Sequence, residues 1–364
     1  MIPCSNPNYD NCNVQDQPAE TDWHDILMDS IVSAEQLAKV LPIDSDEIKQ
    51  VTAHYPMRIN PYYLSLIHTP GDGIWKQAVP DIREISDPSG MADPLCEEGQ
   101  SPVPNLTHRY PDRVLFLVSN RCAVYCRHCM RKRKVGASHV VTDETIREGI
   151  TYIRKTKSVR DVLISGGDPL LLEDDQLERI LQQLSAIEHV DFLRIHTRIP
   201  CTLPHRITPA LCRMLSKYHP LYINTHFNHP AEITAEASRA CSLLANSGIA
   251  LGCQTVLLKG VNDQPAVMKQ LMRQLLRIRV RPYYLHHPDV VRGTGHFRTS
   301  IKEGLNIIKS LRGHISGMGI PHYVIDLPGG GGKIPLLPEY IKGEHNGMLI
   351  VENYQGKRFE YPLE

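Results

Sequence analysis

The fold is decided by an alternation that begins at residues 114–119, which read VLFLVS. Five further apolar runs follow it: DVLISG (161–166), FLRIHT (192–197), LYINTH (221–226), ALGCQTVLL (250–258) and PYYLHH (282–287). Segments with helical periodicity lie between these runs, such as ETIREGITYIRK and QLERILQQLSAI. Buried strands separated by helices of this length indicate βαβ units and a parallel sheet. Six units are fewer than the eight of a closed TIM barrel, so we predict an α/β fold built on a partial (β/α)6 TIM-like barrel.

The segments on either side of this alternation have a different character. Residues 1–20 are polar and are expected to be disordered. Residues 21–110 predict an N-terminal helical module and a loop-rich connector, with one helical pattern from position 22 to about 51. Residues 111–327 form the predicted barrel core, and residues 328–364 are expected to supply a glycine-rich loop and a short C-terminal extension.

Bulk composition excludes several classes of protein. In the 364 residues, 40 Lys and Arg balance 40 Asp and Glu, so no net charge favours a nucleic acid or a membrane surface. The first residues lack the pattern of a secretory signal, and no apolar run approaches the ~20 residues that cross a bilayer. We therefore expect a cytoplasmic protein. Thiols stay reduced in that compartment, so the ten cysteines are not expected to form a disulfide framework.

Chemically special residues stand at or near the carboxyl ends of the predicted strands. Following the chain, they are Cys122, then Ser165, Gly166, Gly167 and Asp168, then Arg198, His226, Gln254 and Asp289. In parallel α/β folds this end of the sheet carries the site. All six units therefore point to one pocket.

Three cysteines within this set are clustered. Cys122, Cys126 and Cys129 have the spacing CxxxCxxC directly after the first strand. A structural zinc site usually has four ligands, a redox dithiol needs only two cysteines, and inert thiols would not be flanked by a run of basic residues. That run is expected to favour thiolates. Three thiolates favour an iron–sulfur cluster that keeps one iron open for another ligand.

A second unusual motif is PGGGGK at residues 328–333. Four glycines allow positive φ and a close approach of the backbone to a ligand. A Walker-type phosphate loop would need Ser or Thr after the lysine, where Ile334 stands. A lysine after a glycine hinge can instead form a Schiff base and later swing away, which makes Lys333 a candidate for covalent cofactor attachment.

The order and spacing of several motifs resemble one known family. The CxxxCxxC loop is similar to the signature of radical S-adenosylmethionine (SAM) enzymes. More narrowly, the chain resembles the lysine 2,3-aminomutases over roughly residues 20–364. The shared motifs are SPVPNLTHRYPDRV, CRHCMRKRK, SGGDPL, NTHFNHPAEIT, LLKGVND, RPYYL, HFRTSIKEG and DLPGGGGK.

The resemblance implies three cofactors and assigns residues to each. Cys122, Cys126 and Cys129 would ligate a 4Fe–4S cluster, whose open iron binds SAM and generates a 5′-deoxyadenosyl radical. Lys333 would anchor pyridoxal 5′-phosphate (PLP), and Arg109, Tyr110 and Arg113 would help to bind it. The two arginines would contact its phosphate, because guanidinium groups suit phosphate oxygens. Residues assigned to SAM would be Ser165, Gly166, Gly167, Asp168, Arg198, His226 and Gln254.

The substrate implied by the resemblance is lysine, whose α-amino group would move to C3 to give β-lysine. Arg131 would bind the substrate carboxylate, while Asp289 and Asp326 would hold the ε-ammonium. Two neighbouring buried carboxylates repel each other unless a cation lies between them, which disfavours glutamate and leaves arginine as an alternative. A lysine 2,3-aminomutase of translation factor P maturation and a non-catalytic iron–sulfur regulatory protein are further alternatives.

The chain also departs from the family pattern. Gln264 follows GVND, where family members have a cysteine that binds zinc across a subunit interface, and the C-terminal zinc cysteines are absent from the 364 residues. Cys253 stands where the family usually has asparagine, which puts the neighbouring cofactor contacts in doubt. We expect a homo-oligomer without structural zinc, and an electron donor such as flavodoxin or ferredoxin as partner.

Overall fold

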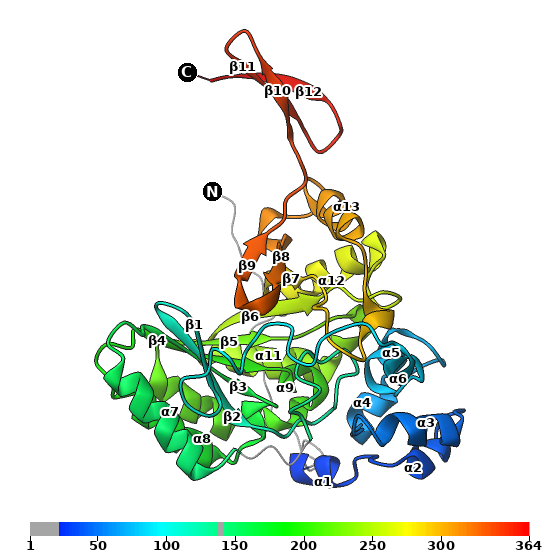
Figure 1. The fold of residues 1–364 in the computed structure, drawn as a ribbon, viewed down its shortest axis with the longest axis vertical. Helices are drawn as coiled ribbons and strands as arrows, with labels where there is room; N and C mark the ends of the chain where they lie inside the picture. The colour runs from blue at the N-terminus through cyan, green and yellow to red at the C-terminus, as the bar shows by residue number, and fades with distance from the viewer. Residues whose placement is uncertain (1–21, 137–140, 364) are drawn as a thin grey trace, which may run out of the picture.

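A computed structural model describes residues 22–136 and 141–363. Its main feature is a nine-stranded sheet in which the strands follow one another in chain order (Figure 1). The strands β2 to β8 are parallel, whereas β1 and β9 at the two edges are antiparallel to their neighbours. The bounds are β1 Leu106–Tyr110, β2 Arg113–Ser119, β3 Asp161–Gly166, β4 Phe192–Thr197, β5 Leu221–Thr225, β6 Ala250–Val256, β7 Arg281–His286, β8 His322–Leu327 and β9 Gly332–Pro335.

Helices connect the parallel strands and cover the outside of the sheet (Figure 1). They are α7 Asp143–Lys155, α8 Asp174–Ser185, α9 Ile199–Thr202, α10 Pro209–Leu215, α11 Ala235–Asn246, α12 Pro265–Arg277 and α13 Ile301–Leu311. The six predicted strand–helix units are thus confirmed. The structure adds β8 as a seventh parallel strand, which sequence reasoning missed because only a short apolar run separates its polar ends.

Burial alternates along the strands because one face packs on helices and the other lines the barrel interior. In β4, Leu193, Ile195 and Thr197 are buried, while Arg194 and His196 are only half-buried. A closed TIM barrel fills its interior with apolar side chains. Here the inward-facing positions of β4 carry polar side chains that border open space, so this interior can hold ligands.

The N-terminal module consists of short helices that pack beside the barrel (Figure 1). They are α1 Trp23–Met28, α2 Ala34–Ala38, α3 Ser45–Thr52, α4 Pro61–Ser65, α5 Gly73–Ala78 and α6 Arg83–Ser86. The single helical pattern expected from position 22 to about 51 is split into three helices. Ser33 and Asp44 cause the breaks, because each adopts an extended conformation and caps a new helix with its side chain.

The C-terminal residues form two different structures. The glycine-rich turn after β8 leads into β9, which returns along β8 inside the main sheet. The strands β10 Ile341–His345, β11 Met348–Glu352 and β12 Arg358–Pro362 then form a separate sheet that projects from the body (Figure 1). In the part of the chain that the structure describes, no helix is long and apolar enough to span a membrane. The disorder predicted for residues 1–20 lies outside the described residues.

Candidate active site

The three cysteines lie in an irregular loop after β2, and the turn after β3 fixes the start of this loop. Gly166 has a φ of +139°, and a Cβ atom there would lie 2.1 Å from the Ser119 carbonyl oxygen. The Gly167 amide donates to that oxygen at 2.6 Å, and the Asp168 amide donates to the Arg121 carbonyl at 2.7 Å. Glycine is therefore required where the turn approaches the backbone that leads into the cysteine loop.

Burial raises the pKa of two of the cysteine thiols, Cys122 and Cys129. It raises the pKa of Cys122 well above its usual value, and the charges of Asp168, Cys129 and Cys126 add to this. Burial, together with Cys126, also raises the pKa of Cys129. The three sulfur atoms are thus close enough to influence one another. Arg131 and Lys132 do lower the pKa of Cys129, as expected from the basic run, and Arg198 lowers that of Cys122, but burial outweighs these charges at both thiols. A coordinating metal deprotonates a thiol.

The basic run has a different role, because buried carboxylates pair with it. Glu84 from α6 accepts from Arg127 Nε at 2.8 Å and Nη2 at 2.6 Å, and from Lys132 Nζ at 2.5 Å. The Glu84 side chain is 0% exposed. Burial opposes its ionisation, but the charges of Arg127 and Lys132 outweigh burial and lower the pKa of Glu84. Sequence reasoning missed this residue, since no local pattern distinguishes Glu84 from other acidic residues.

The donor set of the loop fits a multinuclear cluster better than a single ion. Among the residues that the structure describes, no three His, Cys, Asp or Glu side chains are grouped closely enough to hold one metal ion. A four-iron cluster binds each cysteine at a different iron atom, so its ligands need not converge on one point. Three neighbouring, half-buried thiols in one loop meet that requirement.

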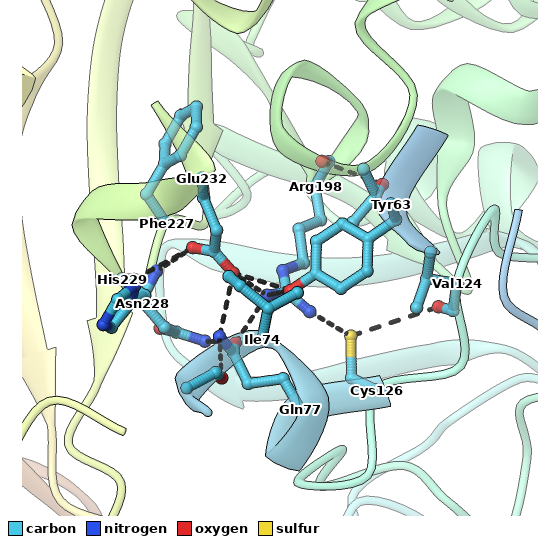
Figure 2. A network of polar contacts seen from close by, with 12 residues as sticks. Tyr63, Ile74, Gln77, Val124, Cys126, Arg198, Phe227, Asn228, His229 and Glu232 are labelled. Carbon is cyan, nitrogen blue, oxygen red and sulfur yellow. Dashed lines mark hydrogen bonds and ion pairs between the residues drawn. The ribbon is translucent and has the colours of Figure 1, made fainter. Parts of the chain in front are cut away.

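Arg198, at the end of β4, reaches the cysteine loop. Its Nη1 atom lies 2.6 Å from Cys126 Sγ (Figure 2). Its Nε atom is buried without a hydrogen-bond partner among the described residues. Its backbone amide donates to Asp168, whose carboxylate also accepts from Thr197 Oγ1 at 2.7 Å. Burial raises the pKa of Asp168 to about 6. The unpaired Nε of Arg198 can donate a hydrogen bond to an anionic group bound beside the cluster position.

The three other residues assigned to SAM lie in or directly after strands β3, β5 and β6. Burial lowers the pKa of His226 to about 3, and the charges of His286, Arg198 and Arg131 add to the effect. His226 therefore stays neutral at physiological pH. Gln254 lies in β6 and is 7% exposed. Ser165 is buried at the end of β3.

Arg131 is already paired with a carboxylate that sequence reasoning missed. Its Nε and Nη2 atoms donate to Glu97 at 2.7 to 3.2 Å. Glu97 comes from the connector before β1 and is 2% exposed. Asp289 lies near this pair, and burial raises its pKa to about 7, with a further increase from Asp326 that Lys333 and Arg131 oppose.

Lys333 and Asp326 face each other across the hairpin of β8 and β9. Lys333 Nζ donates to Asp326 Oδ1 at 2.9 Å, and Arg109 Nη1 lies 3.8 Å from the same oxygen. Burial opposes ionisation of Asp326, but His286 and Lys333 outweigh it and lower the pKa of Asp326 to about 2. The Tyr110 hydroxyl accepts from the Lys333 backbone amide at 2.8 Å. An ammonium group is thus held by the carboxylate predicted to bind one.

A cavity of about 530 Å³ opens at the amino ends of the parallel strands. Arg113, Arg194, Asn224, Tyr283 and nine other residues of its lining come from these strands, and Ile320 completes it. Arg113 also stacks over the Tyr110 ring at 4.6 Å. Of the four residues assigned to PLP, only Arg113 lines the cavity, and it connects to Lys333 through Tyr110, whose hydroxyl accepts from the Lys333 backbone amide. The cationic and aromatic groups of the lining fit a phosphorylated aromatic cofactor.

Electrostatic effects on His226 link the groups near the cysteine loop with those near Lys333. Cys126 contacts Arg198, and the charge of Arg198 acts on His226. His226 is in turn influenced by His286, which lies 3.7 Å from Asp326, the partner of Lys333. These effects support the prediction that the cysteine loop and the amine of Lys333 border the same interior, which stays a prediction.

Comparison with known proteins agrees with this arrangement. Residues 116–271 match the Radical SAM superfamily, and residues 308–363 match the family Lysine-2,3-aminomutase. The L-lysine 2,3-aminomutase of Clostridium subterminale is 48% identical over 348 residues, which cover 93% of this chain and 84% of the relative. The chain belongs to the lysine 2,3-aminomutase family.

Other relatives within the lysine 2,3-aminomutase family show the range of names it carries. The L-lysine 2,3-aminomutase of Methanococcus maripaludis is 49% identical and covers 92% of this chain and 80% of its own. The glutamate 2,3-aminomutase of Clostridioides difficile is 46% identical, and the match covers 93% of this chain and 82% of that relative. As a radical SAM aminomutase, this family member is an isomerase that uses a 4Fe–4S cluster, SAM and PLP. Overall sequence identity does not distinguish lysine from glutamate as the substrate, because relatives of both names are similarly identical to this chain. The residues of the site have to decide between them.

Proposed function

We propose that this aminomutase moves the α-amino group of L-lysine to C3 and produces β-lysine. The observation that carries the proposal is the pairing of an ammonium group with Asp326 at 2.9 Å, beside Asp289. The ammonium belongs to Lys333, whose side chain is chemically identical to that of the substrate. The pair supports a binding site for a primary ammonium group at this corner of the interior.

Charge in the interior favours lysine over glutamate. Asp326 is ionised at neutral pH, since its pKa is about 2, and Asp289 with a pKa of about 7 can ionise when a cation arrives. A second carboxylate from glutamate would be repelled there. A guanidinium group can also pair with carboxylates, so arginine is the competitor that an experiment must include.

The chain's own residues would divide the remaining work. Cys122, Cys126 and Cys129 hold the cluster, and Lys333 with Arg109, Tyr110 and Arg113 holds PLP. Arg131, aimed by Glu97, binds the substrate carboxylate. The turn from Ser165 to Asp168, together with Arg198, His226 and Gln254, surrounds SAM. When bound, the cluster with SAM supplies a hydrogen-abstracting radical, and PLP carries the amino group during its migration.

Product analysis tests the proposal. Enzyme reconstituted without oxygen is incubated separately with lysine, arginine and glutamate, and amino acid products are separated by chromatography. We expect β-lysine from lysine and no β-amino acid from glutamate. The Lys333→Ala variant serves as the control and should lack both product and cofactor absorbance. Turnover of arginine in preference to lysine, or of glutamate, would contradict the substrate assignment.

The partner and location predictions extend this proposal. The small-molecule substrate follows from the family, whereas an electron donor such as flavodoxin or ferredoxin and a homo-oligomer without structural zinc stay predictions. The cytoplasmic location also stays a prediction.

A further inference from the structure

The Arg198 guanidinium divides its hydrogen bonds between the cysteine loop and a buried polar cluster. Nη1 donates to Cys126 Sγ at 2.6 Å. Nη2 donates to three oxygen atoms on the other side: Glu232 Oε1 at 2.7 Å, Gln77 Oε1 at 2.6 Å and the Tyr63 hydroxyl at 3.1 Å (Figure 2). We call Tyr63, Gln77 and Glu232 the clamp.

The clamp is rigid because its members are buried and bonded to one another. All three are 0% exposed. Glu232 Oε1 also accepts from the Tyr63 hydroxyl at 2.7 Å and from Gln77 Nε2 at 2.9 Å. Its second oxygen accepts from the backbone amides of Asn228 at 2.6 Å and His229 at 3.0 Å. A carboxylate fixed in this way leaves the guanidinium little freedom to turn away from Cys126.

Two of the three clamp residues lie outside residues 116–271, which match the Radical SAM superfamily. Tyr63 lies in α4 and Gln77 in α5, whereas the superfamily match begins at residue 116. The N-terminal module thus contacts Nη2 of Arg198, while Nη1 of the same guanidinium contacts Cys126 of the cluster loop (Figure 2). This connection gives the module a part in the chemistry besides packing.

A charged donor on a cluster sulfur changes the energetics of electron uptake. One-electron reduction adds negative charge to the cluster and its thiolate ligands, and a hydrogen bond from a cation stabilises that charge. Cys129 Sγ receives the backbone amide of Arg131 at 3.3 Å, which is a neutral donor. Among the described residues, only the Arg198 contact brings a charged side-chain donor to one of the three sulfurs.

We propose that the clamp positions Arg198 on Cys126 and thereby raises the reduction potential of the cluster. The proposal rests on the cluster assignment made above. It makes the clamp residues positioning residues, since they act through Arg198. One electron from an external reductant enters the cluster, and no proton or bond changes at Arg198.

The test compares two neighbouring tyrosines of α4. Tyr63→Phe removes the hydroxyl that contacts Arg198. Tyr62→Phe is the matched control, because its hydroxyl bonds Thr234 Oγ1 at 2.8 Å. Both variants lose one hydroxyl and no charge. The midpoint potential of the reconstituted cluster is measured by electron paramagnetic resonance during titration with dithionite, without SAM. We expect a lower midpoint for Tyr63→Phe and the wild-type value for Tyr62→Phe.

A second variant keeps the proposal open to refutation. Arg198→Lys retains the charge but lacks the fork that joins Cys126 to the clamp, so its midpoint should fall below that of Tyr63→Phe. A wild-type midpoint in whichever of these two variants retains its iron would overturn the proposal, even if activity fell. Equal decreases in Tyr63→Phe and Tyr62→Phe would overturn it as well. Absence of any cluster signal in the wild-type protein would instead refute the cluster assignment.

Discussion

Replacing Asp289 by asparagine is expected to remove the pH dependence of lysine binding. Burial and the neighbouring Asp326 raise the pKa of Asp289 from 3.8 to about 7. Asp326 itself is ionised throughout this range, because its pKa is about 2. Binding of a substrate ammonium group requires the Asp289 carboxylate, so below its pKa the enzyme must release a proton before it binds lysine. Affinity should therefore rise with pH.

The size of the effect follows from this single titration. One pH unit below the pKa, about nine-tenths of the carboxyl is protonated, and one unit above it about nine-tenths is ionised. Lysine should therefore bind roughly tenfold more weakly at about pH 6 than at about pH 8. The Lys333 ammonium opposes the rise of this pKa. Engagement of that amine by the cofactor should move the profile to higher pH and keep its slope.

Calorimetric titration of the holoenzyme with lysine measures both the affinity and the protons released. Norleucine is the matched ligand control, since it lacks only the ε-ammonium group and should show no such dependence. Asp289→Asn should bind lysine more weakly at about pH 8, by about 2 kcal/mol or more, and with a flat profile. The reasoning is refuted if wild-type affinity is flat between these pH values, or if the variant keeps the wild-type slope.

Two further substitutions test the framework of the site. Glu84→Gln breaks a buried ion pair and should lower the free energy of unfolding by about 3–5 kcal/mol in denaturant titration. The control is Glu98→Gln, whose side chain is 66% exposed and which should change the free energy of unfolding by less than about 1 kcal/mol. Equal effects of the two substitutions would contradict the burial argument. Gly166→Ala places a Cβ atom 2.1 Å from the Ser119 carbonyl, and iron analysis after reconstitution should show loss of most cluster iron. Gly317→Ala, which meets nothing within 4 Å, should retain it, and full iron in Gly166→Ala would disprove the role of the turn.

The fold was predictable because its signals are local. Each of the six predicted strands is a short apolar run, and each helix shows its own periodicity, so the order of units could be read without knowing any long-range contact. The strand β8 was not predicted because its apolar run is short. The helix breaks at Ser33 and Asp44 were not predicted because the apolar periodicity continues across them. The first error left out one strand, and the second left out two helix caps; the rest of the predicted pattern was correct.

The composition of the site was predictable in part. The carboxyl ends of the parallel strands predict that Arg198, His226 and Asp289 share one interior, which is supported by the charge of Arg131 acting on both His226 and Asp289. The ionisation of the thiols was not predictable, because burial of Cys122 outweighs the nearby positive charge. Sequence shows which charges are near along the chain but not how far each is removed from water.

The amino-acid sequence by itself determined the parallel barrel, the cysteine triad and the lysine after four glycines, since spacing and periodicity encode all three. Only the tertiary structure decided which carboxylate neutralises which base: Glu84 with Arg127, Glu97 with Arg131, and Glu232 with Arg198. These partners stand 34 to 43 positions apart in the chain. A buried charge must find an opposite charge wherever the packed elements bring one, and no local pattern records that choice.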